Sequence, residues 1–175
     1  MSEDLRYPIG NFQPVTEVTP EMREKFIQTI EELPSKLREA VSDLGDKQLD
    51  TPYRPGGWTM RQLVHHVADS HINAFCRFKL GLSEETPTIK PYDEALWAET
   101  ADSKNAPIDL SLNVIDGVHA RWAMLLKSMT ETDFERRIYH PERGEMSLNS
   151  LLALYDWHSR HHRAHITKLR ERNNW

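Results

Sequence analysis

Apolar side chains recur every three or four residues in four long stretches of this chain, and no stretch shows a sustained alternation of apolar and polar residues. This spacing places the apolar side chains of each stretch on one face of a helix. The first stretch opens at Thr19-Pro20, where a capping residue precedes a proline at the first helical position. We expect Pro34, which lies inside the stretch, to kink the helix. The apolar face consists of Met22, Phe26, Ile30, Leu33, Leu37, Val41 and Leu44.

The second and third stretches are also predicted to be helices. Thr59 and Gln62 have the spacing of a capping box, which begins a helix that continues to about Leu82. The third helix is expected to begin near Asp109 or Ser111. The apolar face of the second helix consists of Val64, Val67, His71, Phe75 and Phe78, and that of the third consists of Ile115, Val118, Trp122, Leu125 and Met129.

The fourth helix is expected from about Ser147 to about Arg172, and its inward face contains histidine. Side chains at steps of three and four form one stripe that is apolar at both ends and carries imidazoles in the middle. Imidazoles fill a core poorly, because both ring nitrogens need partners when they are buried. The stripe consists of Leu151, Tyr155, His158, His162, His165 and Leu169.

The links between these helices indicate the topology. Ser83–Pro107 is a link of about 25 residues, a length that suits a crossover between parallel neighbours or a cover over a site. We expect a short helix within it at Tyr92–Asp102, around Trp97. Arg137–Met146 is expected to form a small hairpin with a Pro-Glu-Arg-Gly turn. The predicted fold is therefore all-α, a four-helix bundle with a long crossover between the second and third helices and a hairpin before the last.

Length, composition and charge narrow the class of protein. A chain of 175 residues is expected to form a single domain, residues 1–175, with a substantial core. No apolar run approaches the roughly 18 residues that span a bilayer, so we expect no membrane partner. The acidic start, residues 1–8, lacks the apolar region of a signal peptide.

Cysteine content and net charge bear on disulfides, cellular location and nucleic-acid binding. Cys76 is the only cysteine, which excludes an intramolecular disulfide and fits a cytoplasmic location. The chain carries 27 acidic and 22 basic residues, for a net charge of −5. Nucleic-acid-binding proteins usually present a basic face, so we expect no nucleic-acid partner.

His158 and His162 have the spacing by which a helix presents two nitrogens to one metal ion, because they lie one turn apart on the same face. A set of hydrogen-bonded core histidines, or a pH-sensitive packing face, would show the same pattern. In the metal interpretation a third ligand must come from another helix. The candidates on the second helix are His65, His66 and His71, of which the helical wheel alone favours His71.

Several familiar metal motifs are absent. The segment His158–His162 has no glutamate after its first histidine, so it lacks the general base of a zincin. The sequence has no Glu-x-x-His motif, which excludes the di-iron carboxylate bundles, and one cysteine cannot build a structural zinc site of several thiolates. Neutral imidazole suits zinc, nickel, copper or iron. Three protein ligands with an open position are typical of catalytic zinc.

Two stretches of the sequence, Trp58–His71 and Tyr155–Ile166, strongly resemble the DinB-like superfamily. The likeness begins at Tyr7–Gly10, continues through Gln48–Arg54 and covers nearly the whole chain. The resemblance implies a DinB-like bundle that acts as a metal-dependent hydrolase on a small-molecule substrate, and it suggests a homodimer. It also implies one divalent metal per chain, for which we expect zinc, with nickel as the alternative. The ligands that it implies are His66, His158 and His162, with His66 in place of the His71 of the helical wheel.

Three functions are compatible with such a site. In a hydrolase, the metal would lower the pKa of bound water toward neutrality. In a thiol transferase, a function that the resemblance implies for some relatives, the metal would activate a low-molecular-weight thiol such as bacillithiol. The third possibility is a non-catalytic metal-binding bundle, which the spare histidines His161 and His165 favour.

The remaining candidates concern the surroundings of the metal. Asp69 could orient His65 or His66 through a hydrogen bond, and Asp69 and Asp156 are weak candidates for a general base. Cys76 is expected off the core face of its helix, which argues against a role as nucleophile. The candidate walls of a substrate cleft are the Ser83–Pro107 segment, Trp58, Trp97 and Trp157.

Overall fold

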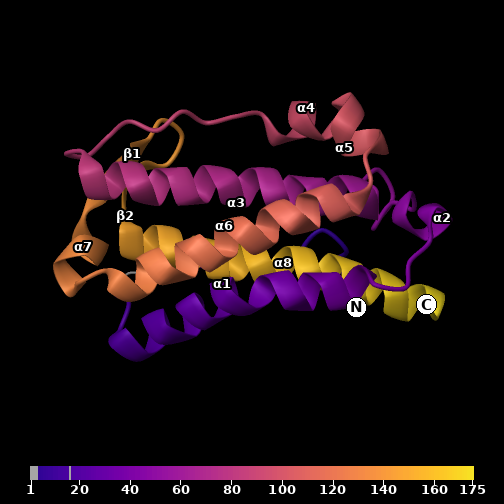
Figure 1. The fold of residues 1–175 in the computed structure, drawn as a ribbon, viewed down its shortest axis with the longest axis horizontal. Coiled ribbons are helices and arrows are strands. Elements are labelled where there is room, and N and C mark those ends of the chain that lie inside the picture. Colours follow the sequence, from indigo (N-terminus) through magenta and orange to yellow (C-terminus); the bar gives the residue numbers. More distant parts are fainter. Residues whose placement is uncertain (1–3, 16) are drawn as a thin grey trace.

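The computed structural model describes residues 4–15 and 17–175 and is a four-helix bundle, as the sequence predicts (Figure 1). Residues 1–3, which belong to the acidic start, lie outside the described part. Among the described residues, no helix combines the length and the apolar character needed to cross a bilayer. The long helices are α1 (Pro20–Val41), α3 (Met60–Ser83), α6 (Ile108–Ser128) and α8 (Leu148–Asn173).

Each long helix packs against one parallel and one antiparallel neighbour. In Figure 1, α1 and α8 run in one direction, and α3 and α6 run in the other. The parallel pairs α1–α8 and α3–α6 are in contact, as are the antiparallel pairs α1–α6 and α3–α8. A short loop can join only antiparallel neighbours, so the parallel pair α3–α6 requires the long Ser83–Pro107 crossover.

Shorter elements lie in the connections. The crossover contains two short helices, α4 (Glu94–Ala98) and α5 (Ala101–Asn105), where the sequence suggested one. The predicted hairpin is present as the antiparallel strands β1 (Arg137–His140) and β2 (Gly144–Ser147). Gly144 has a φ of +75°, a conformation that glycine adopts without strain. The helices α2 (Asp46–Leu49) and α7 (Glu131–Glu135) were not predicted, because each is too short to carry a periodic pattern.

The four long helices begin near the predicted residues, and three of them have a side-chain cap. The Thr19 side chain accepts a hydrogen bond from the backbone of Met22, and that of Ser147 accepts one from Ser150. Both halves of the capping box form at Thr59 and Gln62. Helix α6 begins at Ile108, the residue before the predicted Asp109, and it has no side-chain cap.

The buried face of α6 is rotated from the predicted one. We expected Val118, Leu125 and Met129 to face the core, but all three are only partly buried. Leu125 and Met129 pack against the edge of the core. The helix instead buries a histidine, His119, beside Trp122. Periodicity cannot identify this face, because a polar residue interrupts the apolar pattern that defines it. The buried positions are Leu112, Ile115, His119, Trp122, Ala123 and Leu126.

Candidate metal centre

His66, His158 and His162 bring their ring nitrogens together between α3 and α8. His66 belongs to α3, and the other two lie on successive turns of α8. The Nε2 atom of His158 lies 3.3 Å from Nε2 of His66 and 3.1 Å from Nε2 of His162. One nitrogen of each ring lies within 4.8 Å of the others. Two helices therefore bring three nitrogen atoms that can ligate a metal into one cluster.

These separations fit a bound metal ion. Zinc held tetrahedrally by imidazoles at about 2.0–2.1 Å places its nitrogen ligands about 3.3–3.4 Å apart. The two Nε2 separations that join this cluster, 3.1 and 3.3 Å, are close to that spacing. His66 and His162 are only 8% and 7% exposed, so their nitrogens have little access to water. The donor set suits zinc, nickel or copper.

Burial keeps these three rings neutral. It lowers the pKa of His66 to about 4 and the pKa values of His158 and His162 well below the ordinary 6.5. Loss of hydration is the largest cause in each case, and neighbouring histidines lower the pKa further because charge on one ring disfavours charge on the next. Neutral imidazole is the form that ligates metal. The site is therefore suited to bind a metal near neutral pH.

His65, the neighbour of His66 in the chain, is directed to another part of the molecule. Its Nδ1 lies 2.7 Å from Oγ of Ser111, and its Nε2 lies 3.1 Å from the carbonyl oxygen of Ala106. Because a carbonyl only accepts, Nε2 carries the proton and Nδ1 accepts from the serine. His65 thus ties α3 to the beginning of α6.

His71, the helical-wheel choice for the third ligand, lies behind His158. It is fully buried, and its Nε2 lies 3.0 Å from Nδ1 of His158, on the opposite side of that ring from Nε2. Nδ1 of His71 lies 2.8 Å from Nε2 of His119 on α6. The structure therefore groups His66, and not His71, with the two histidines of α8. Sequence reasoning did not consider His119, because a single histidine on another helix carries no local signal.

The other histidines of α8 pair with each other. Nε2 of His161 lies 3.1 Å from Nε2 of His165, and the His161 ring stacks on Trp157 with centroids 4.4 Å apart. One nitrogen each of His161, His162 and His165 also falls within 4.8 Å. All three belong to one helix, and His161 and His165 do not belong to the set that α3 and α8 bring together. The cluster of His66, His158 and His162, to which both α3 and α8 contribute, is the better candidate for a metal centre.

A cavity of about 330 Å³ is lined by all three candidate ligands. Arg77 lies about three helical turns after His66 and so on the same face of α3. Its Nη1 donates to the hydroxyl of Tyr155 at 3.4 Å, and it forms no ion pair within the described part of the chain. This shared face is the signal that could have identified Arg77 from the sequence. Other lining residues include Trp58, Tyr92, Glu94, His140, Glu142, Tyr155 and Trp157.

The predicted cleft walls are only partly confirmed. Trp58 and Trp157 line the cavity, and the crossover contributes Tyr92. Trp97 does not line it, because this side chain is 42% exposed and packs on Tyr92 with ring centroids 4.4 Å apart. Cys76 is exposed and lies outside the cavity lining, as its position off the core face of α3 led us to expect.

Neither candidate carboxylate lines the cavity. Asp156 is buried, accepts a 2.7 Å hydrogen bond from Thr29 and forms an ion pair with Arg160 at 2.6 Å. These contacts hold it against α1. Burial raises the pKa of Asp69 to about 6, but within the described residues no hydrogen bond joins its carboxylate to His66. Their position outside the cavity lining argues against a role as general base for either aspartate.

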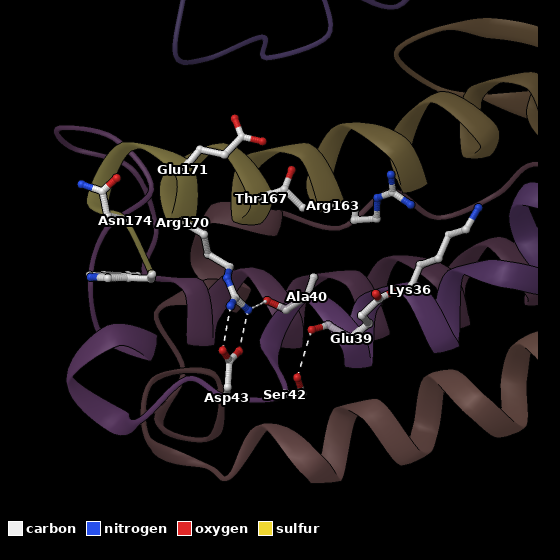
Figure 2. A pocket seen from close by; sticks show the side chains of 11 residues that line it. Lys36, Glu39, Ala40, Ser42, Asp43, Arg163, Thr167, Arg170, Glu171 and Asn174 are labelled. Atoms are coloured by element: carbon white, nitrogen blue, oxygen red, sulfur yellow. Dashed lines mark hydrogen bonds and ion pairs between the residues drawn. The ribbon is translucent and has the colours of Figure 1, made fainter.

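A larger hollow lies between the C-terminal halves of α1 and α8 and has a volume of about 600 Å³ (Figure 2). Its lining is mostly charged or polar, and Arg170 forms an ion pair with Asp43 at 2.7 Å across it. Among its described lining residues there is neither histidine nor cysteine. The smaller cavity over the histidine cluster is therefore the better candidate for chemistry.

Comparisons with known proteins agree on one family. Residues 29–166 match the family model of the DinB superfamily. The chain is 57% identical over 173 residues to a protein of Bacillus mycoides (strain KBAB4) named "Putative metal-dependent hydrolase", and the match covers 99% of each chain. A protein of Bacillus cereus (strain B4264) with the same name is 56% identical over 172 residues, covering 98% of this chain and 99% of its own.

A solved structure is similar over the same length. It is YfiT from Bacillus subtilis, described as "a probable metal-dependent hydrolase with an unusual four-helix bundle topology". The TM-score is 0.96 and the identity 51%, with coverage of 98% of this chain and 99% of YfiT. The parallel α1–α8 and α3–α6 pairs described above belong to that bundle topology.

Proposed function

The chain belongs to the DinB superfamily, and we propose that it is a metal-dependent hydrolase whose metal is held by His66, His158 and His162. Relatives that are 51% to 57% identical over nearly the whole chain carry the name or description of metal-dependent hydrolases. The observation that carries the proposal is the convergence of three neutral imidazoles from two helices at the lining of a cavity.

The site has the composition of a catalytic rather than a structural metal centre. Three protein ligands leave at least one coordination position open, and the cavity lies beside them. When bound, a divalent metal supplies Lewis acidity and lowers the pKa of a coordinated water toward neutrality. We expect zinc, with nickel as the alternative, because neutral imidazole suits both.

The protein's own residues would bind and orient the substrate. Trp58 packs against His66, with centroids 4.7 Å apart, and Trp157 lines the same cavity, so both limit the access of water. Arg77 is half-buried there without a carboxylate partner in the described chain. Its guanidinium offers N–H donors to a carbonyl or anionic oxygen of a small-molecule substrate.

A thiol transferase is the second candidate, and the size of the cavity favours it. A volume of about 330 Å³ is far more than the roughly 30 Å³ that one water occupies. The cavity can therefore admit a low-molecular-weight thiol beside an electrophilic substrate. In this alternative the same three histidines would hold the metal.

The two functions differ in the nucleophile, and an assay that varies it separates them. Metal-stripped protein is reloaded with zinc or nickel and assayed on a panel of esters and amides. It is also assayed on a halo-bimane with bacillithiol, glutathione, cysteine or no thiol. We expect turnover of a member of the ester and amide panel without a thiol. This activity should be lost in His162→Ala and retained in the matched control His165→Ala, which changes a histidine outside the cavity lining.

The other outcomes are equally informative. Metal-dependent conjugation with one thiol, and no ester or amide turnover, would replace the hydrolase by the transferase. A loaded protein that performs neither reaction would support a non-catalytic metal-binding bundle. Hydrolysis that persists in both the stripped protein and His162→Ala would contradict the metal-dependent mechanism.

A further inference from the structure

The half-buried His158 and the buried His71 and His119 form a continuous line of hydrogen bonds from the metal centre to the far side of the bundle. Nδ1 of His158 lies 3.0 Å from Nε2 of His71, and Nδ1 of His71 lies 2.8 Å from Nε2 of His119. Nδ1 of His119 lies 2.5 Å from the carbonyl oxygen of Ile30. The line starts on α8, passes through α3 and α6 and ends on α1, so it joins all four long helices of Figure 1.

The direction of every hydrogen bond in this line follows from its last member. The Ile30 carbonyl can only accept, so Nδ1 of His119 carries a proton and, in a neutral ring, Nε2 accepts. Nδ1 of His71 must then donate to it, which makes Nε2 of His71 an acceptor. By the same argument Nδ1 of His158 donates. Nε2 of His158 is thereby left unprotonated, with its lone pair on the side that faces His66 and His162.

Pro34 explains why the Ile30 carbonyl is available. In an α-helix the carbonyl of residue 30 normally accepts from the N–H of residue 34. Proline has no N–H, and Pro34 lies inside α1. The carbonyl therefore lacks its usual helical partner and faces His119, which is 1% exposed. A helix-interior proline, otherwise destabilising, here creates a fixed acceptor within the core.

The inner part of the line, His71 and His119, has no access to water that could substitute for its hydrogen bonds. His71 is 0% exposed and is packed edge-on by Trp122 and Tyr155, with centroids 5.9 Å and 5.2 Å away. Within the described chain, His158 is the only one of the three candidate ligands whose Nδ1 is hydrogen-bonded. A hydrogen bond from the second nitrogen of a ligating histidine orients the ring and makes it a better donor.

We propose that His71 and His119 are positioning residues that hold His158 with Nδ1 protonated and Nε2 free for the metal, through a relay anchored on the carbonyl that Pro34 leaves unpaired. This inference rests on the proposed metal site and adds two residues to it that do not ligate. Buried histidines that merely fill the core would also be satisfied, but they would have no effect on metal affinity.

Two measurements test the relay. In metal-free wild-type protein labelled with ¹⁵N, two-bond ¹H–¹⁵N couplings identify the protonated ring nitrogen, and we expect Nδ1–H on His71, His119 and His158. Metal affinity is then compared by competition with a chelator. His71→Met and His119→Met should weaken zinc binding about 10–100-fold. His71→Gln should retain most of the affinity, because its amide can accept from His158 and donate to His119.

His65→Met is the matched control, since His65 is another buried α3 histidine with both nitrogens bonded, but away from the metal. The His65→Met substitution should lower the free energy of unfolding and leave the zinc affinity within about twofold of that of the wild type. Nε2–H at His71 or His119, or unchanged affinity in folded His71→Met and His119→Met, would overturn the relay alone. A wild-type protein that binds no metal would overturn the metal site itself. The tautomer measurement needs no variant, so it can overturn the relay even if the variants do not fold.

Discussion

At the scale of single residues, what distinguishes the nine histidines is the partner of each ring nitrogen. His65 is bonded at both nitrogens to the α5–α6 region, and His71 is bonded at both to other histidines. His66 and His162 instead direct Nε2 toward Nε2 of His158. Residues with the same side chain and similar burial thus serve as a tether, a positioning group or a candidate ligand.

The buried histidines predict that acid destabilises the metal-free protein. Burial lowers the pKa of both His66 and His119 to about 4, from an ordinary value of 6.5. Between these values the unfolded chain binds more protons than the folded one, so the free energy of unfolding falls as the pH falls. At pH 5 each of these two rings should contribute a loss of about 2 kcal/mol relative to pH 7. Chemical denaturation of chelator-treated protein at pH 7 and pH 5 measures this loss of unfolding free energy.

His119→Met provides the control for this prediction. Removal of the titrating ring should reduce the difference in unfolding free energy between pH 7 and pH 5 by about 2 kcal/mol. A wild-type protein that is equally stable at both pH values, or a variant with an unchanged difference, would show that these rings are not held neutral by burial.

Sequence reasoning found the residues whose signal is local. His158 and His162 stand one turn apart on a stripe that is otherwise apolar, and this combination suggested a shared metal. The choice of His66 over His71 came from the family resemblance, because a helical wheel ranks positions by their angle to the apolar face and does not show which of them faces α8. His119 could not be found, since its role depends on the placement of α6 against α1 and α3.

At the scale of elements, the strongest local patterns predicted best. Capping signals located the beginnings of α1, α3 and α8, and the Gly144 turn located the hairpin. The buried face of α6 was predicted wrongly because His119 occupies a core position there. Where a functional residue replaces an apolar one, the periodic pattern that defines a helix face is interrupted.

Two glycines in long helices are expected to respond to alanine in opposite ways. A Cβ atom on Gly81 of α3 would lie 2.8 Å from Cδ2 of Leu148 and 3.2 Å from Cγ2 of Ile138, and both of these side chains are fully buried. Gly81→Ala should therefore lower the unfolding free energy, since overpacking costs about 1–3 kcal/mol. A Cβ atom on Gly117 of α6 would have no such neighbour within 4 Å, so Gly117→Ala should raise it by roughly 0.5–1 kcal/mol.

Urea denaturation of Gly81→Ala, Gly117→Ala and wild type measures these two changes in unfolding free energy. The helix propensity of alanine is the same in both, so the difference between them isolates the close contact of α3 with Leu148 and Ile138. A stabilised Gly81→Ala would mean that these side chains have room to move, and it would contradict the tight packing at this end of the bundle.

At the scale of the whole molecule, the topology brings the metal centre together. His66 and the α8 histidines are far apart in sequence, and they meet because α3 and α8 are antiparallel neighbours. The crossover that the parallel α3–α6 pair requires also supplies Tyr92 to the cavity beside them. The bundle and the length of this link could be predicted from the sequence. The packing order of the helices, on which the cavity depends, could not.

The metal content of the untagged protein tests the central claim most directly. Elemental analysis of wild type, after reloading with zinc or nickel and removal of excess ion, should give one divalent metal per chain. The double variant His158→Ala/His162→Ala and the single variant His66→Ala should retain little or none, whereas the neighbouring control His65→Ala should bind as wild type does. A wild-type protein that cannot be loaded, or a double variant that keeps its full metal content, would contradict the three-histidine site.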